Sequence, residues 1–268
     1  LYRIQTTHGN TRVSEGTPKL VISNALPTAT SLITFGSGRN FDLGGFDQTV
    51  ASIQGSNGFI QNSGTTTSTL TINGSANTSS GQAIRNATNL VRAGTGTTSL
   101  SGSQGALSYT GSTTISSGSL LLSSGSASLT ATSAVSVEGG SLISGSAVGN
   151  LALGVGNVTM SAGSINPGGI GSTAGFSLAA NRNFTTTGGT INIDLNTSGA
   201  LDQMFGSGTG VFSLTNTTIA LNLVPWTPAD YSETYAILSG FSGGSISNLT
   251  ITGYDTANYT ASLSNTGV

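Results

Sequence analysis

Apolar and polar residues alternate along this chain in short runs separated by small and turn-forming residues. Residues 39–43, 49–53, 58–62 and 69–73 each place apolar side chains at every second position, the period of a strand with one buried face. The intervening segments are Gly44-Gly45, Gly55-Ser56-Asn57 and Ser63-Gly64, where glycine supplies positive φ at little steric cost. The pattern predicts short strands and no helix, apart from a possible turn near residues 83–89.

Strands this short cannot bury an apolar face unless they stack on similar strands. Residues 89–122 show the pattern most clearly, and stacking of such units is the principle of a solenoid. Coils of roughly 20 to 25 residues, stacked at about 4.8 Å, predict about a dozen coils in a rod. We expect Leu, Ile, Val, Ala and Phe inside, with Ser, Thr and Asn outside or stacked as ladders at the corners.

The composition agrees with a solenoid and excludes several classes of function. Charged residues are 6% of the 268, against about a quarter in an ordinary globular domain, and Gly contributes 40. The recurring aliphatic residues argue against disorder. The absence of cysteine excludes disulfides and thiolate chemistry. The net charge of −2 gives no basic footprint for nucleic acid.

The apolar pattern predicts neither a membrane span nor a signal peptide within this sequence. No run approaches the roughly 18 apolar residues that cross a bilayer, and no signal peptide opens the sequence. Because the chain starts abruptly at Leu1, we expect a processed piece of a longer precursor.

The two ends differ in residue composition from the middle, and this difference predicts three segments. Residues 1–34 carry Arg3, Arg12, Lys19, Glu15 and the single histidine, His8. They read either as a cap that prevents end-to-end contact or as an arm that pairs with a neighbouring subunit's strand edge. Residues 35–223 read as the β-helix. Residues 224–268, rich in proline and aromatic residues, suit closure of the C-terminal end or an aromatic glycan platform.

One stretch resembles a known family. Residues 90–102 read LVRAGTGTTSLSG and residues 109–120 read YTGSTTISSGSL. This segment closely resembles the autotransporter-associated β-strand repeat. The shared pattern is an apolar pair, a basic residue, Gly-x-Gly, alternating Thr and Leu, then Tyr-Thr-Gly and a Thr-Thr-Ile strand. Three further regions are similar to the flanks of such proteins. They are residues 41–53, residues 162–168, and the region from Asp194 through Asp202 to residues 227–238.

The resemblance covers most of residues 36–268 and carries several implications. It implies an all-β, right-handed parallel β-helix with capped ends. It also implies export by a Gram-negative-type bacterium, with the protein extracellular or at the cell surface. The anchoring route stays open between an autotransporter passenger and a secreted surface protein with a removable sorting signal.

The sequence contains no convincing catalytic constellation. Glycosidases need paired carboxylates, and the close pairs here are Asp42 with Asp47 and Asp230 with Glu233. We predict that these carboxylates accept backbone N–H groups at turns and caps. Gly94-x-Gly96 and Gly168-Gly169-x-Gly171 lack the context and the lysine of a phosphate loop, so they are interpreted as turn residues. We therefore predict no catalytic residue, no metal and no cofactor.

These observations leave three functions to consider. The first is a non-enzymatic extracellular structural protein, a β-helical rod that builds surface fibres or matrix by contacts between its ends or along its sides. The alternative is a monomeric adhesin stalk that binds surface glycans along a lateral face; an enzyme of the β-helix carbohydrate class is a third. No nucleic acid is expected as a partner. The residues expected at the contacts are Tyr2, Arg3, Arg12, Trp226, Tyr231, Tyr254 and Tyr259.

Overall fold

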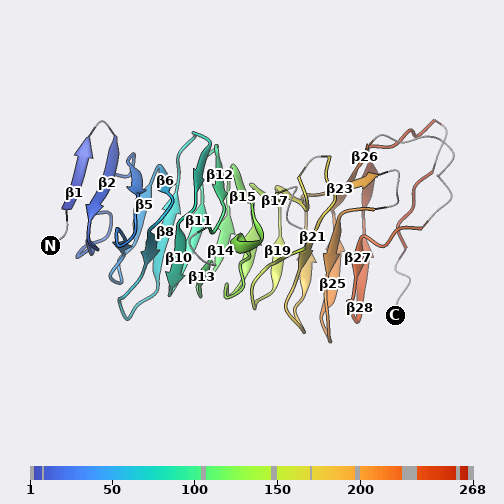
Figure 1. The fold of residues 1–268 in the computed structure, drawn as a ribbon. Coiled ribbons are helices and arrows are strands. Elements are labelled where there is room, and N and C mark those ends of the chain that lie inside the picture. Colours follow the sequence, from blue (N-terminus) through green and yellow to red (C-terminus); the bar gives the residue numbers. More distant parts are fainter. Residues whose placement is uncertain are drawn as a thin grey trace.

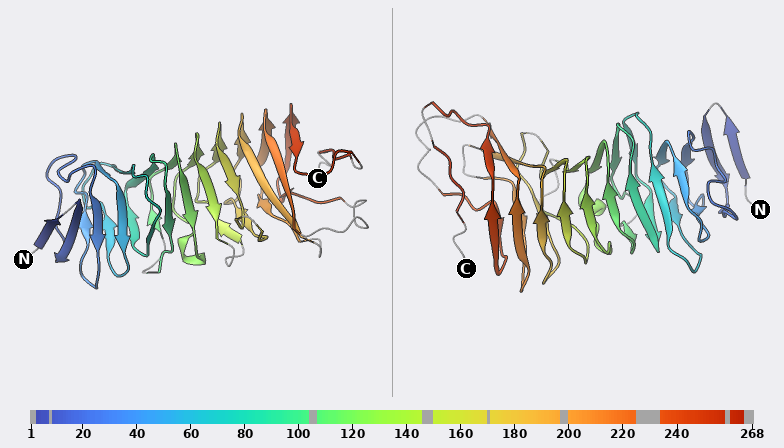
Figure 2. Two further views of the ribbon diagram at one scale, coloured as in Figure 1. Left: turned by 90° about the horizontal axis from the view of Figure 1, so that it is seen from above. Right: turned by 180° about the vertical axis from the view of Figure 1, so that it is seen from behind.

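The computed structural model winds the chain into a rod of stacked parallel strands, with the N-terminal hairpin at one end and the latest strands at the other (Figure 1; Figure 2). It describes residues 3–7, 9–103, 107–145, 150–169, 171–196, 200–224, 234–257 and 260–264. The all-β, parallel β-helix prediction is confirmed. A single short 3-10 helix, η1 (Gly125–Ala127), interrupts the strands in this part of the chain.

The largest sheet, sheet I, runs the length of the rod and has 12 strands. Its first pair, β1 with β2, is antiparallel, and every later pair is parallel. In order the strands are β1 (Arg3–Thr7), β2 (Asn10–Glu15), β3 (Ser31–Thr34), β6 (Ser52–Gly55), β9 (Thr78–Ser80), β12 (Thr97–Leu100), β15 (Ser119–Leu122), β17 (Ser141–Ser144), β20 (Ser164–Asn166), β23 (Thr190–Asn196), β26 (Thr218–Val224) and β29 (Thr250–Thr252).

Sheet II forms a second side and has nine parallel strands. They are β5 (Gln48–Val50), β8 (Ser68–Ile72), β11 (Thr88–Arg92), β14 (Thr113–Ile115), β16 (Val135–Val137), β19 (Val158–Met160), β22 (Phe184–Thr186), β25 (Val211–Thr215) and β28 (Gly243–Ser247).

The third side is divided into two sheets of four strands each. The first contains β4 (Phe41–Asp42), β7 (Phe59–Gln61), β10 (Ala83–Asn86) and β13 (Ser108–Tyr109). The second contains β18 (Asn150–Ala152), β21 (Gly175–Ser177), β24 (Gln203–Phe205) and β27 (Leu238–Ser239). The coil that contains η1 lies between them and supplies no strand to this side.

The coils are fewer and more variable than the sequence pattern predicted. The nine strands of sheet II are separated by eight turns of the chain, so the expected dozen was too many. Part of the reason is that the coils lengthen, because the sequence interval from Thr218 to its partner Thr250 is longer than that from Ser119 to its partner Ser141. The chain before β2 also forms the antiparallel strand β1 in place of a coil, and the coil from β2 to β3 supplies no strand to sheet II.

The core is a set of in-register columns of apolar side chains inside the rod. One column of sheet I contains Leu120, Leu142 and Ile165, which are fully buried direct partners in successive strands. Because each coil places an equivalent side chain about 4.8 Å above the last, every strand buries its apolar face on its neighbours. Burial of each such side chain stabilises the fold by about 1.5–3 kcal/mol.

Asparagine side chains link successive coils at the corners, as expected for polar ladders. Each side-chain carbonyl oxygen accepts an N–H from the next coil. Asn24 accepts from Thr49 at 2.8 Å, Asn89 from Ser112 at 2.9 Å, and Asn157 from Asn183 at 2.9 Å. These bonds satisfy backbone donors that leave the sheets at the corners.

Two local predictions were wrong. Residues 49–53 are split at Ala51, because the chain turns there from sheet II into sheet I. The possible helical turn at residues 83–89 is instead the pair β10 and β11, which meet at a bend where Asn86 has φ of 63°. Asparagine tolerates this left-handed conformation better than most residues, so it turns the chain without glycine.

Strands also lie within both predicted end segments. β2 and β3 lie within residues 1–34, and β27, β28 and β29 lie within residues 224–268; all five belong to the stacked sheets. In the described part of the chain no helix has the length and apolar character needed to cross a membrane.

Candidate functional site

Arg92, the basic residue of the repeat-like segment, is a buried corner residue. Its side chain is 1% exposed and stands in a column of sheet II between Ile72 and Ile115. Its guanidinium donates to the carbonyl of Ile72 at 2.8 Å, to that of Gly74 at 2.9 Å, and also to that of Gly96. Burial lowers the pKa of Arg92. The side chain therefore joins two coils and is not presented to a ligand.

The Gly-x-Gly of the same segment lies at this corner because two coils approach closely there. A Cβ on Gly94 would lie 2.1 Å from the carbonyl oxygen of Asn73, and one on Gly96 would lie 2.3 Å from that of Ala76. Neither glycine has positive φ. The interpretation as turn residues is confirmed, but the requirement is for space between coils and not for an unusual backbone angle.

Tyr109, from the Tyr-Thr-Gly element, also faces inward. It is fully buried, and its hydroxyl shares a 2.6 Å hydrogen bond with that of Thr113. Burial raises the pKa of Tyr109 to about 12, so the phenol is neutral and acts as a core side chain with one satisfied polar group.

The carboxylates of Asp42 and Asp47 accept backbone N–H groups, as predicted. Asp42 Oδ1 accepts from Gly44 at 2.9 Å and from Ser63 at 3.0 Å, while Asp47 Oδ1 accepts from Thr69 at 2.6 Å. Burial acts to raise the pKa of Asp42, but its hydrogen bonds outweigh burial and leave the pKa below its ordinary value. The other close pair, Asp230 and Glu233, lies outside the described residues.

A second pair of aspartates holds the glycine-rich loop after β20. Asp194 Oδ2 accepts the N–H groups of Gly171 and Ser172, and Asp202 Oδ1 accepts that of Ala174 at 2.8 Å. The second oxygen of Asp202 accepts the N–H of Asp194 at 2.9 Å. Burial, together with the nearby charge of Asp194, raises the pKa of Asp202 to about 7. The pair thus joins one region that resembles a family flank to the loop that follows another, residues 162–168, and sequence spacing alone did not place them together.

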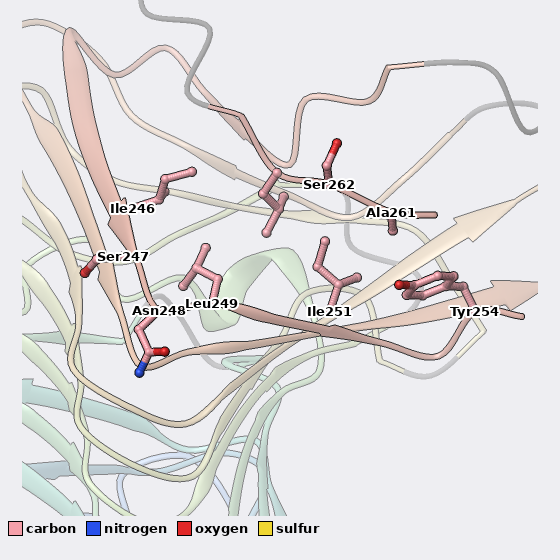
Figure 3. Close-up of a pocket in the computed structure, with 9 residues that line it drawn as sticks. Ile246, Ser247, Asn248, Leu249, Ile251, Tyr254, Ala261 and Ser262 are labelled. Carbon is pink, nitrogen blue, oxygen red and sulfur yellow. The ribbon is translucent and has the colours of Figure 1, made fainter. Parts of the chain in front are cut away.

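The C-terminal end of the rod contains an apolar cavity of about 540 Å³. It is lined by the inner faces of β23, β25, β26 and β28 and by residues 260–264. A neighbouring hollow in the same region has a volume of about 360 Å³. In Figure 3 its residues Ile246, Leu249 and Ile251 face Ala261 and Ser262. Core residues in the middle of the rod are almost fully buried. Around this cavity, by contrast, several of the apolar residues are only half-buried.

The N-terminal end presents a different surface. Residues 19–24 form an outer layer over the first coil, with the N–H of Leu20 bonded to Asp42 and that of Asn24 to Asp47. Val21 and Ile22 in this layer are 80% and 62% exposed, the highest values among the described large hydrophobic residues. The predicted contact residues did not include this pair, although the consecutive run Leu20-Val21-Ile22 breaks the alternation and was the available signal.

Three of the predicted contact residues are described, two near the N-terminal end and one near the C-terminal end. Arg12 is exposed on β2 with its guanidinium carbon 5.8 Å from the centre of the Phe35 ring. Arg3 lies in β1, and Tyr254 is partly buried and lines the C-terminal cavity. Tyr2, Trp226, Tyr231 and Tyr259 lie outside the described residues.

Comparison of the chain with protein-family models, with curated proteins and with solved structures gave no match. The stacked parallel sheets show that the chain is a β-helix built from repeated strands, as the family resemblance implies. Among the described residues no three His, Cys, Asp or Glu side chains are grouped so that they could hold a metal ion. The two ends of the rod are candidate sites, since the C-terminal cavity and the exposed Val21 and Ile22 lie there.

Proposed function

We propose that this chain is a non-enzymatic, extracellular structural protein, a β-helical subunit of bacterial surface fibres or matrix that associates with copies of itself through its ends. The observation that carries the proposal is that sheet I, as far as the structure describes it, ends in an unpaired strand edge at both ends of the rod. β1 and β29 are its terminal strands, so the outer backbone edge of each lacks a partner strand among the described residues. Such edges are templates for pairing with another chain.

The interior supports the same proposal. Along the rod the inward positions are filled by packed side chains, and the described cavities lie at the C-terminal end. The buried charged side chains Arg92, Asp42 and Asp202 hydrogen-bond backbone groups of the same chain. The resemblance to the autotransporter-associated repeat adds the expectation of export to the cell surface.

The test is the association state of the purified 268-residue chain over a wide range of concentration. Light scattering should show a mass that rises with concentration, and electron microscopy should show filaments or short arrays of rods. Isolated rods of monomer mass at every concentration would contradict the proposal.

A monomeric adhesin stalk remains the second candidate because Tyr254 lines an open hollow that polar and apolar groups share. Tyrosine rings are common platforms for ligands that have both apolar and polar faces. Glycan-array binding that is lost on Tyr254→Ala, with the protein still monomeric, would favour this candidate over fibre formation.

A further inference from the structure

The charges of this chain are sorted along its length. Residues 1–92 contain six Lys or Arg and three acids, a net charge of +3. Residues 93–182 contain one base, Arg182, and one acid, Glu138. Residues 183–268 contain no base and five acids, a net charge of −5, and the three parts together give the total of −2.

The fold converts this order into an axial polarity. Successive coils are stacked in sequence order, so the position of a described strand in the chain is also its position along the rod (Figure 2). A compact fold would mix early and late residues, but a solenoid keeps them at opposite ends. Among the described residues, the N-terminal part of the rod is therefore net basic, and the charged residues of the C-terminal part are all acids, Asp194, Asp202 and Asp255. Asp230 and Glu233 lie outside the described residues.

The two ends also differ in their apolar surfaces in a complementary way. The C-terminal end is hollow, with partly covered Phe212, Leu221 and Ile246 around the cavity. The N-terminal end is a layer of backbone that carries the exposed Val21 and Ile22. Exposed apolar side chains at one end and an apolar cavity at the other can bury each other's surface, whereas two copies of the same end cannot combine the two features.

We propose that the association is head to tail, with the N-terminal layer of one copy seated on the C-terminal end of the next. This inference rests on the proposed self-association and adds its polarity and its contact surfaces. β1 of one copy pairs with β29 of its neighbour, and the layer of residues 19–24 covers the apolar cavity. Because β1 runs antiparallel to the other strands of its sheet, this junction is antiparallel.

Charge selects this arrangement over the symmetric ones. Head-to-head and tail-to-tail contacts place like charges together, whereas a head-to-tail contact brings the basic part of one copy to the acidic part of another. A head-to-tail pair still has one free N-terminal surface and one free C-terminal surface. Further copies can therefore add at both ends, and the contact propagates into a linear filament.

The polarity can be tested with single cysteines because the natural chain has none. Gln5→Cys lies on β1, Thr252→Cys on β29, and Thr159→Cys on the side of the rod in β19; all three side chains are exposed. Mixing the Gln5→Cys and Thr252→Cys proteins under mild oxidation should give cross-linked dimers. Neither protein alone, nor either one mixed with Thr159→Cys, should give them at a comparable rate.

The outcomes separate the two proposals. Association without the Gln5–Thr252 cross-link, or with an equal cross-link between two Gln5→Cys chains, would overturn the head-to-tail polarity and leave self-association standing. A chain that stays monomeric by light scattering would reject both.

The apolar contact has its own test in the double variant Val21→Ser/Ile22→Ser. Both side chains are exposed in the single rod, so its unfolding midpoint should stay near that of the natural chain, while association weakens about tenfold or more. Val155→Ser is the matched control, because Val155 is 48% exposed in the middle of the rod. Equal weakening by the control, or no weakening by the double variant, would contradict the proposed contact.

Discussion

Arg92 stands where neighbouring coils have isoleucine, and its charge is compensated by carbonyl groups that already have other partners. The carbonyl of Ile72 also accepts the N–H of Ala93 at 2.9 Å, and that of Gly96 accepts the N–H of Ser119 at 3.1 Å. The guanidinium therefore provides additional hydrogen bonds to these acceptors, together with the packing of a long side chain. Removal of the charge alone leaves neither of these two carbonyls unpaired.

This arrangement predicts an order among substitutions at position 92. Arg92→Ala should lower the free energy of unfolding by about 2–4 kcal/mol, because it opens a cavity in a packed column. Arg92→Met should cost less than about 1.5 kcal/mol, because it keeps most of the volume and removes the cost of burying a charge. Urea denaturation of the two variants checks the order, and equal losses would show that the hydrogen bonds dominate.

Asp202 should make stability depend on pH between about 4 and 7. Its pKa is about 7 in the folded rod and 3.8 when exposed, so the folded state holds a proton that the unfolded state has released. Stability should therefore rise as the pH falls from 8 to about 5. It should fall again below the ordinary pKa of Asp42, whose folded pKa is lowered.

The unfolding midpoint measured across this range checks the prediction, with Asp202→Asn as the comparison. The amide cannot ionise, so the variant should lose most of the slope between pH 5 and pH 8. A natural chain that becomes more stable from pH 5 to pH 8 would contradict the assignment.

At the scale of elements, the strands were predictable and several of their boundaries were not. Alternation at residues 58–62 and 69–73 found β7 and β8, because a period of two directly reflects one buried face. The split at Ala51 was missed because the apolar pattern continues on both sides of a corner. The lengthening of later coils was missed because loop length leaves no trace in the strand period.

The contacts within the candidate sites were predictable only in part. The resemblance identified Arg92, Gly94 and Gly96 as a unit, but not that all three serve one corner. Asp194 and the loop after β20 lie nearly a full coil apart in the sequence, and only the stacking of coils brings them together. Pairing at a distance of one coil depends on register, which single residues do not reveal.

Close approach between coils predicts a strong effect of small substitutions at corners. Gly94→Ala should destabilise the rod by about 1–3 kcal/mol, since its Cβ would lie 2.1 Å from a backbone oxygen that cannot move independently. Gly243→Ala is the control, because a Cβ there would meet nothing within 4 Å and φ is not positive. Thermal unfolding of both variants checks this, and an equal effect would argue against crowding as the cause.

For the whole molecule, stability should be distributed unevenly along the axis. Each coil contacts only its neighbours, so a terminal coil has fewer contacts than a central one and can open alone. The partly covered apolar residues of the last coils add to this difference.

Hydrogen exchange of the dilute, monomeric chain should therefore show the slowest amides in β12, β15 and β17 and faster exchange in β28 and β29. Under conditions of association the amides of β29 should slow selectively, because its outer edge becomes paired. Uniform protection along the rod would show that it opens only as one unit.

The even spacing of the central coils has a consequence for how such a protein can change in size. Thr97, Ser119, Ser141 and Ser164 are successive partners in sheet I and follow one another at nearly equal intervals in the sequence. A duplicated segment of one such interval would present matching neighbours above and below it, so genetic duplication here would extend the molecule without disturbing either terminus. The sequence interval widens from β23 to β26 and again from β26 to β29. A segment duplicated there would stack on a coil of different length, so its strands and corners would not match those of its neighbours.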